Sequence, residues 1–358
     1  MASNDLRIDH GQDLALIPSR AAGLRWLVIA ALFVALPWLI DEYLLSQFTF
    51  ICIYAIAGLG MMVLLGYTGL VSFGQAAFLA IGAYTAGALE TAGVPFVVAL
   101  PAAGLVAAAA GVMIGLPALR MTGLFLAIAT LSFAFIVEEV ITRWTSVTRG
   151  SLGLIMPDAT LFGWAIDSER KFYLLCLGVL VLCLLGVANL LRSPIGRAFI
   201  AIRDSRIAAQ SMGVNLATYQ TLSFAIGAAL TGFAGALLAH KLTFITPEQF
   251  GINVSIEMLT LVVVGGLGSL HGVVFGAAFI ILLPQVIAGL RGLLPAAIAN
   301  QTGIETAAFG IILILFIIVE PGGIYGRWQS LRRYWSEFPF CKAGSFKRQR
   351  SFLKSERW

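Results

Sequence analysis

Few side chains of this sequence have the types and spacing that catalysis or metal binding requires. Cys176 and Cys183 stand seven residues apart, but no histidine or carboxylate accompanies them at metal-ligand spacing. Three of the cysteines lie in apolar stretches, where a thiol behaves as a small hydrophobic group. We therefore expect no metal site and no cofactor in this chain. The residues considered are Cys52, Cys176, Cys183, Cys341, His10, His240 and His271.

ATP hydrolysis is not expected of this chain either. A P-loop ends in Gly-Lys-Ser/Thr, because its backbone amides and its lysine together hold the phosphates of the nucleotide. None of the lysines in this sequence follows a glycine. If the protein performs powered work, ATP must be bound and hydrolysed by a partner subunit.

The polar segment 193–215 carries the signals of two short helices. Pro194 suits the first position of a helix, where its missing N–H costs nothing. The first helix is expected from about Ile195 to Ile202. Asp204 or Ser205 is then placed to cap a second helix.

This second helix is expected to present a small apolar face surrounded by arginines. It should run through Met212 and end in a left-handed turn at Gly213. Such a compact helical unit suits a groove in another protein, whereas the alternative is an amphipathic loop that lies on a membrane surface. The side chains of the face are Ile207, Ala208 and Met212.

The composition of the chain indicates a membrane protein. Of the 358 residues, 59% are apolar and 11% are charged, and the mean hydropathy is +0.93; about a quarter of the residues of a soluble domain are charged. The apolar blocks have the length that crosses a ~30 Å hydrocarbon layer. The predicted fold class is all-α, a polytopic transmembrane bundle of about ten spans (eight to ten) with possible broken helices. The candidate spans are 24–40, 48–65, 70–89, 94–118, 123–141, 172–191, 217–239, 256–268, 270–290 and 304–320.

The distribution of Lys and Arg predicts the orientation of the chain. Most of the 23 basic residues fall on one side if both termini are cytoplasmic, and basic loops are retained in the cytoplasm. The expected organisation is a polar cytoplasmic segment 1–23, a membrane domain 24–325 and a basic cytoplasmic tail 326–358. The tail mixes arginines with aromatic residues, which favours contact with anionic membrane lipids. The net charge of +5 therefore requires no nucleic acid.

Charged side chains cluster at the ends of the predicted spans. Ion-coupled carriers usually need an ionisable group within the membrane. No Asp, Glu, Lys or Arg lies clearly at the middle of a span, and Glu139 with Arg143 has the spacing of an interfacial helix pair. An ion-coupled secondary transporter or a passive channel is therefore the less favoured interpretation.

Segment 193–215 resembles the coupling loop of the branched-chain amino-acid ABC transporter permease family, in its LivM-like branch. The family pattern is met by Ser193–Arg197, Ala201–Asp204 and Ala208–Gly213, whereas Ile207 stands where many other ABC importers have an acidic residue. The resemblance implies that the loop inserts into an ATPase subunit. The loop residues that it singles out are Pro194, Gly196, Arg197, Arg203, Asp204, Ala208, Ala209 and Gly213.

A glycine-rich stretch, Gly66–Tyr84, is similar to the N-terminal signature of the same family, and the resemblance extends over roughly residues 25–325. Glycines in membrane helices permit breaks where the backbone is buried or lines an aqueous path, although plain helix packing is the alternative. We expect such breaks here and near residue 265. The predicted pathway residues are Tyr67, Thr68, Gly69, Ser72, Gly74, Gln75, Gly265, Gly266 and Gly268.

The resemblance implies an importer that works by alternating access in a bacterial plasma (inner) membrane. Its expected partners are a second homologous permease, two ATP-binding cassette ATPase subunits and a periplasmic or surface substrate-binding protein. Branched-chain or other small amino acids are the expected substrates. Urea, short amides and aromatic acids remain open, because the sequence does not identify the substrate.

Overall fold

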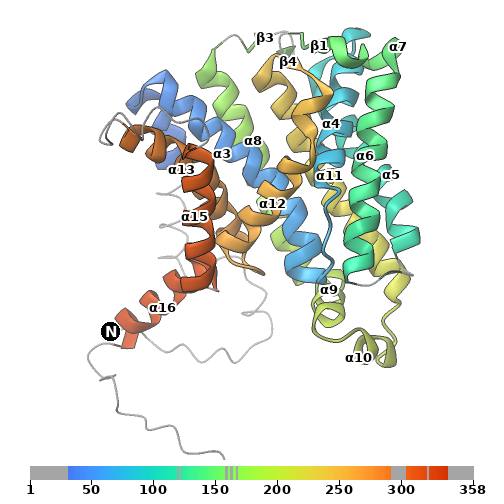
Figure 1. Cartoon of the computed structure of the whole chain (residues 1–358), viewed down its shortest axis with the longest axis vertical. Helices are drawn as coiled ribbons and strands as arrows, with labels where there is room; N and C mark the ends of the chain where they lie inside the picture. The colour runs from blue at the N-terminus through green and yellow to red at the C-terminus, as the bar shows by residue number, and fades with distance from the viewer. Residues whose placement is uncertain are drawn as a thin grey trace, which may run out of the picture.

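The computed structural model describes residues 31–291 and 304–337, apart from 119–120, 122, 158–159, 162–163, 167 and 321. The predicted N-terminal segment 1–23, the start of span 24–40 and the tail beyond 337 lie outside the described residues. Within them the chain is a bundle of long helices that run between two opposite ends (Figure 1). The all-α expectation therefore holds for the described bundle.

The helices carry the labels of Figure 1. In the first part of the chain they are α3 (Glu42–Met61), which continues as the π-helix η1 (Met62–Tyr67), α4 (Gln75–Thr91), α5 (Phe96–Ala118), α6 (Leu124–Arg143), α7 (Thr145–Thr148), the short 3-10 turn η2 (Gly150–Leu152) and α8 (Glu169–Arg192). The later helices are α9 (Pro194–Asp204), α10 (Arg206–Ser211), α11 (Leu216–Leu242), η3 (Pro247–Phe250), α12 (Ile252–Gly265), α13 (Leu270–Arg291), α15 (Ile304–Val319) and α16 (Gly323–Glu337).

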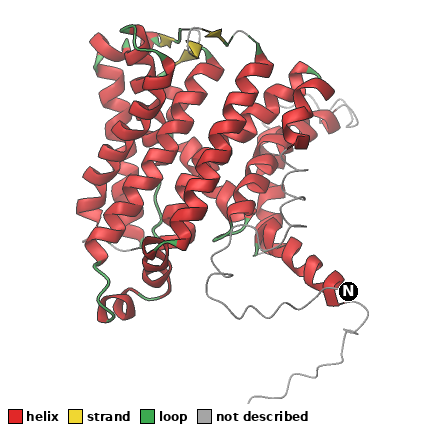
Figure 2. Ribbon diagram, turned by 180° about the vertical axis from the view of Figure 1, so that it is seen from behind, coloured by secondary structure: helices red, strands yellow, loops and turns green. Residues whose placement is uncertain are grey.

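The two ends of the bundle differ in structure. One end bears α9, α10 and α16, and we call it the knob end (Figure 1). The other, the strand end, bears four strands of two residues each, which the sequence did not predict (Figure 2). There β1 (Leu154–Ile155) pairs antiparallel with β4 (Phe244–Ile245), and β2 (Thr160–Leu161) with β3 (Trp164–Ala165).

Helix α11 occupies the centre of the bundle, and glycines bring its neighbours close. A Cβ added at Gly82 of α4 would lie 2.2 Å from the carbonyl oxygen of Gly232, and one at Gly111 of α5 would lie 2.6 Å from that of Phe224. Only glycine permits such backbone contact between helices. Helix α11 is therefore the element against which α3, α4 and α5 are positioned.

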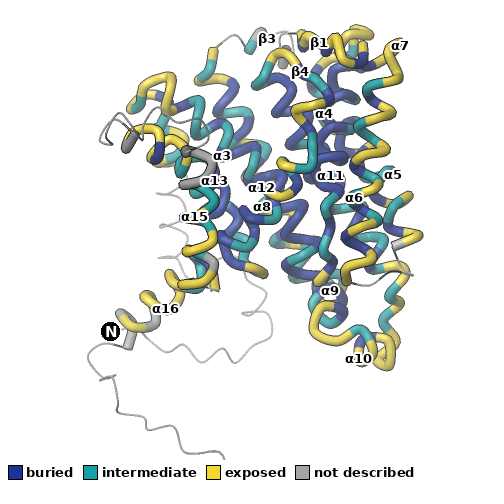
Figure 3. Tube along the Cα trace, viewed as in Figure 1, coloured by how far each residue is buried: buried dark blue, intermediate teal, exposed yellow. Residues whose placement is uncertain are grey.

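Large apolar side chains are exposed on the outside of the bundle. Leu105 of α5, Phe125 of α6 and Leu182 of α8 are 70%, 72% and 69% exposed. Buried residues gather in the interior, as the dark segments of Figure 3 show. An apolar exterior around a packed interior is typical of a protein that is surrounded by lipid or by partner helices.

The described residues contain fewer candidate spans than the sequence predicts for the whole chain. Seven of the described helical segments are long and apolar enough to cross a membrane: Glu42–Tyr67, Phe96–Pro117, Leu124–Arg143, Glu169–Arg192, Leu216–Leu242, Pro247–Gly265 and Leu270–Gly289. Helix α15 has 16 residues, and span 24–40 is described only from residue 31. The predicted span 70–89 is observed as the 17-residue helix α4, which begins at Gln75 because the backbone before it is not helical. The prediction of about ten spans is therefore not reached.

Candidate functional site

The predicted pair of short helices in residues 193–215 is present, and we call this segment the knob. Pro194 occupies the first turn of α9, which is two residues longer at its C-terminus than expected. Ser205 caps α10, because its Oγ accepts a hydrogen bond from the backbone N–H of Ala208 at 3.3 Å. Gly213 has φ +85°, so it forms the predicted left-handed turn after α10.

Apolar side chains of α9 hold the knob against the bundle. Phe199 and Ile202 are 0% and 1% exposed, and the ring of Phe199 meets that of Tyr219 edge-on at 6.5 Å. A Cβ at Gly196 would lie 2.4 Å from the Cα of Leu191, so α9 can pack onto the end of α8 only with glycine there. The root of the knob is therefore part of the packed core.

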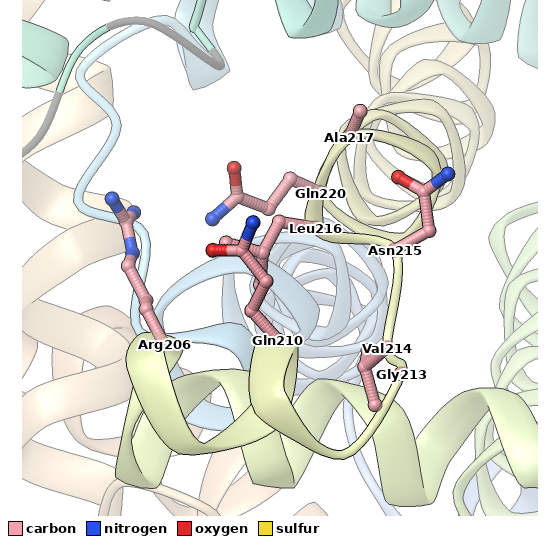
Figure 4. Close-up of a pocket in the computed structure, with 8 residues that line it drawn as sticks. All are labelled: Arg206, Gln210, Gly213, Val214, Asn215, Leu216, Ala217 and Gln220. Atoms are coloured by element: carbon pink, nitrogen blue, oxygen red, sulfur yellow. The ribbon is translucent and has the colours of Figure 1, made fainter.

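The far side of the knob faces outward. Ile207 and Met212 are 81% and 84% exposed, and Ala208 is also exposed, whereas the predicted loop residue Ala209 is buried. Beside this face lies a hollow of about 440 Å³ into which the side chains of Arg206, Gln210 and Gln220 extend (Figure 4). The hollow is lined by Arg206, Gln210, Gly213, Val214, Asn215, Leu216, Ala217 and Gln220. Sequence analysis missed Gln220, which lies within the predicted span 217–239.

The loop arginines and Asp204 differ in what they contact. Nη1 of Arg197 donates to the carbonyl oxygen of Arg192 at 3.2 Å, so Arg197 ties α9 to the end of α8. Arg203 instead extends toward the membrane bundle, and its Nη2 lies 3.1 Å from Oδ1 of Asp204. The side chain of Asp204 is 65% exposed.

The first predicted helix break is a stretch of non-helical backbone between η1 and α4, residues 69–74. Two of its N–H groups donate to hydroxyls, one from another helix and one from the segment itself. The N–H of Phe73 donates to Oγ1 of Thr130 in α6 at 3.0 Å, and that of Gly74 to Oγ of Ser72 at 3.2 Å. At the start of α4, the N–H of Ala76 donates to Oγ of Ser255 in α12 at 2.9 Å. Buried backbone must be paired in this way.

Most of the predicted pathway residues of the first break are buried. Tyr67, Thr68, Ser72 and Gln75 are 5%, 1%, 0% and 0% exposed. Oε1 of Gln75 accepts a hydrogen bond from Oγ1 of Thr231 in α11 at 2.7 Å, while its Nε2 has no hydrogen-bond partner among the described residues. These polar groups are enclosed by the bundle in this conformation. The sequence analysis did not include their partners Thr130, Thr231 and Ser255. A hydroxyl residue inside an apolar span is the feature that could have indicated them.

The second predicted break is the turn 266–269 between α12 and α13. Gly266 and Gly268 have φ +115° and +80°, which L side chains rarely adopt. A Cβ at Gly265 would lie 2.1 Å from the carbonyl oxygen of Gly272, so the backbones of the two helices touch. The segment 256–290 is therefore two helices that meet at a glycine turn, with α12 as the shorter one.

The sequence profile described as "Branched-chain amino acid transport system / permease component" matches residues 43–320, which include the knob and both breaks. The chain belongs to this family. It is 36% identical to the high-affinity branched-chain amino acid transport system permease protein LivM of Salmonella typhimurium, over 83% of this chain and 73% of the relative. LivM of Escherichia coli has the same identity and the same coverage.

A second type of relative is also similar to this permease. The permease protein LivH of Salmonella typhimurium is 27% identical, over 76% of this chain and 91% of LivH. No solved structure shows a significant match. The resemblance expected from the loop and the glycine signature is thus confirmed, and its LivM-like character is supported by the higher identity to LivM.

Near its strand end the permease also contains two polar side-chain pairs, one buried and one partly buried, that the sequence did not predict. Nε2 of His240 in α11 lies 2.8 Å from Oε2 of Glu90 in α4, and the two side chains are 3% and 5% exposed. Lys241 pairs with Glu169 at the start of α8. No spacing in the sequence predicts these pairs, because the two members of each pair lie far apart in the sequence. Among the described residues, no group of three or more His, Cys, Asp or Glu has the arrangement of a metal site.

Proposed function

We propose that this permease is the membrane-spanning subunit of an ATP-driven importer for branched-chain or other small amino acids. The observation that carries the proposal is the knob, which is rooted in the packed core and presents exposed apolar side chains. An apolar face on a root that is packed into the core is suited to insertion into a groove of a partner protein. Closure of ATPase subunits would move this root and reopen the pathway on the other side.

The proposed partners follow from the family and its members. LivM and LivH, both similar to this chain, are named as permease proteins of one type of transport system. We propose a pair of homologous permeases, two ATP-binding cassette ATPase subunits that bind the ATP, and a periplasmic or surface protein that captures the solute. Selectivity then resides mainly in that binding protein, because the first break of the permease offers buried, uncharged polar groups.

We further propose that the knob end faces the cytoplasm of a bacterial plasma membrane. Basic residues concentrate there, with Arg192, Arg197, Arg203 and Arg206 at the knob and Arg327, Arg332 and Arg333 in α16. Arginines are retained on the cytoplasmic side. Helix α16 also exposes Trp328 and Tyr334, 58% and 59%, and this mixture of aromatic and basic side chains suits contact with anionic lipid.

A change of Gly213 to leucine tests the proposal. The leucine must adopt φ near +85°, which costs about 1–2 kcal/mol, although no atom lies within 4 Å of the added Cβ. We expect ATPase subunits to co-purify with the wild-type permease and to be lost from G213L, with both chains inserted in the membrane.

Gly93 provides the matched control, since its φ is +89° and it also has open space around it, but it lies between α4 and α5. G93L should retain the ATPases. Normal co-purification with G213L would count against docking through the knob.

An ion-coupled carrier is the competing function, because the Glu90–His240 pair is a titratable group inside the bundle. Proteoliposomes that contain only this permease decide between the two. The importer requires ATPase subunits and ATP for accumulation, whereas a carrier would accumulate the solute with a proton or sodium gradient alone.

A further inference from the structure

The side chain of Arg203 connects the knob to both helix breaks. Its Nη1 donates a hydrogen bond to the carbonyl oxygen of Gly66 at 2.9 Å, at the end of η1. Its Nε and Nη2 donate to Oδ1 of Asp204 at 3.2 and 3.1 Å. The guanidinium is therefore held from two sides, by the neighbouring carboxylate on the knob and by the backbone of a membrane helix.

The carbonyl of Gly66 is available because η1 ends there. The last carbonyls of a helix have no partner within it. Two of those at the end of η1 are satisfied locally, since that of Val63 accepts from Oγ1 of Thr68 at 2.9 Å and that of Leu64 from the N–H of Leu70 at 2.9 Å. The carbonyl of Gly66 is bound by a residue 137 positions away in the sequence.

Glycines leave the space that this contact occupies. A Cβ at Gly268, in the second break, would lie 3.3 Å from Nη1 of Arg203, and one at Gly69, in the first break, would lie 3.2 Å from its Cγ. The end of η1, next to the first break, also approaches the second break, because a Cβ at Gly66 would lie 3.1 Å from the backbone nitrogen of Gly268. One arginine of the knob thus sits where the two breaks meet.

We infer that Arg203 is the positioning residue through which movement of the knob displaces both breaks. The inference rests on the proposed function, because it assumes that ATPase subunits move the knob. A charged donor on a carbonyl makes a stronger bond than a neutral pair, and the planar guanidinium holds Asp204 and Gly66 at the same time. Contact with the ATPases then falls to α10 and its exposed apolar face, while Arg203 acts toward the membrane.

The experiment uses the complete transporter in proteoliposomes and measures solute imported per ATP hydrolysed. We expect R203A to retain its ATPase subunits and to lose about tenfold in this ratio, as removal of one charge-assisted hydrogen bond predicts. R203K keeps a charged donor but loses the planar guanidinium. Its ratio of solute imported per ATP should lie between those of R203A and the wild type. R143A is the control. It removes the exposed pair of Arg143 with Glu139 at the C-terminal end of α6, far from the knob, and should leave the ratio unchanged.

A second variant acts from the membrane side, without any change to the knob. G268A places a Cβ against the guanidinium and should also lower the ratio. In the R203A background the same change should cost less, because the contact with the guanidinium is gone and only the backbone strain at φ +80° remains.

Three results would overturn the inference. The first is an unchanged ratio in R203A, and the second is loss of the ATPases from R203A, which would make Arg203 a docking contact. The third is strict additivity of R203A and G268A. A wild-type complex that does not transport would overturn the proposed function together with the role of Arg203. A wild-type complex that transports, with an unchanged ratio in R203A, would overturn only the role of Arg203.

Discussion

The two helix breaks of this permease are built in different ways. Residues 69–74 form a non-helical segment in which two N–H groups bind hydroxyls from α6 and from the segment itself, with α12 contributing at the start of α4. Residues 266–269 form a tight turn in which glycine backbones touch one another and the hydroxyl of Ser269 bonds within the turn and to the start of α13. The first break depends on a polar side chain from another helix, and the second mainly on close contact between glycine backbones.

This difference predicts how each break responds to change. Hydrogen bonds to hydroxyls can be exchanged for others during a conformational change at modest net cost. Backbone contact between glycines has no comparable alternative, because any Cβ collides. We therefore expect the first break to rearrange internally during transport and the second to be displaced as one rigid pivot whose internal contacts stay unchanged.

The largest effect is expected at the second break. G265L introduces a side chain where the first carbon already lies 2.1 Å from the carbonyl oxygen of Gly272, so α12 and α13 must separate. We expect loss of the folded permease, measured as monodisperse protein after detergent extraction. G178L is the control, because Gly178 of α8 is exposed and has no atom within 4 Å of an added Cβ. Normal yield of G265L would contradict the pivot.

A moderate effect is expected at the first break. S255A leaves the N–H of Ala76 without its partner, which costs about 1–3 kcal/mol when the group is buried. The permease should fold, unfold at a lower temperature and transport at an altered rate. S132A removes a hydroxyl that bonds only within its own helix at an exposed site, and it should leave both quantities unchanged. Equal melting temperatures for S255A and the wild type would show that this bond does not stabilise the break.

The smallest effect is expected for G69A. Gly69 has φ +73°, so alanine introduces backbone strain of about 1–2 kcal/mol. G93A introduces the same strain in open space, and the difference between the two melting temperatures isolates the contact with Arg203. A larger loss in G93A than in G69A would contradict close packing of Arg203 on the first break.

The knob was predicted almost residue by residue because its signals are local. Pro194, the cap at Ser205 and the left-handed Gly213 each act on the nearest turn of the chain. The positions of the breaks were likewise readable from glycines. What the sequence did not indicate was that Arg203 of the knob would reach Gly66.

The partners of the first break were not predictable, because they come from distant helices. Thr130 and Ser255 are ordinary hydroxyl residues within apolar spans, and only the packing of α6 and α12 brings them to residues 73–76. The pair Glu90–His240 was missed for the same reason, since its members are 150 residues apart. Hydropathy alone also predicted a full span at 70–89, whereas the glycine-rich backbone before Gln75 is not helical and α4 has 17 residues.

The π-helical turn η1 makes chain length at this point a determinant of geometry. A wide turn holds one more residue than an α-helical turn would. Deletion of a single residue between Met62 and Leu65 would let the segment close into an α-helix, in which each carbonyl bonds four rather than five residues ahead. The hydrogen-bond pattern that leaves the carbonyl of Gly66 to Arg203 would then change, although every side chain of the knob was unchanged.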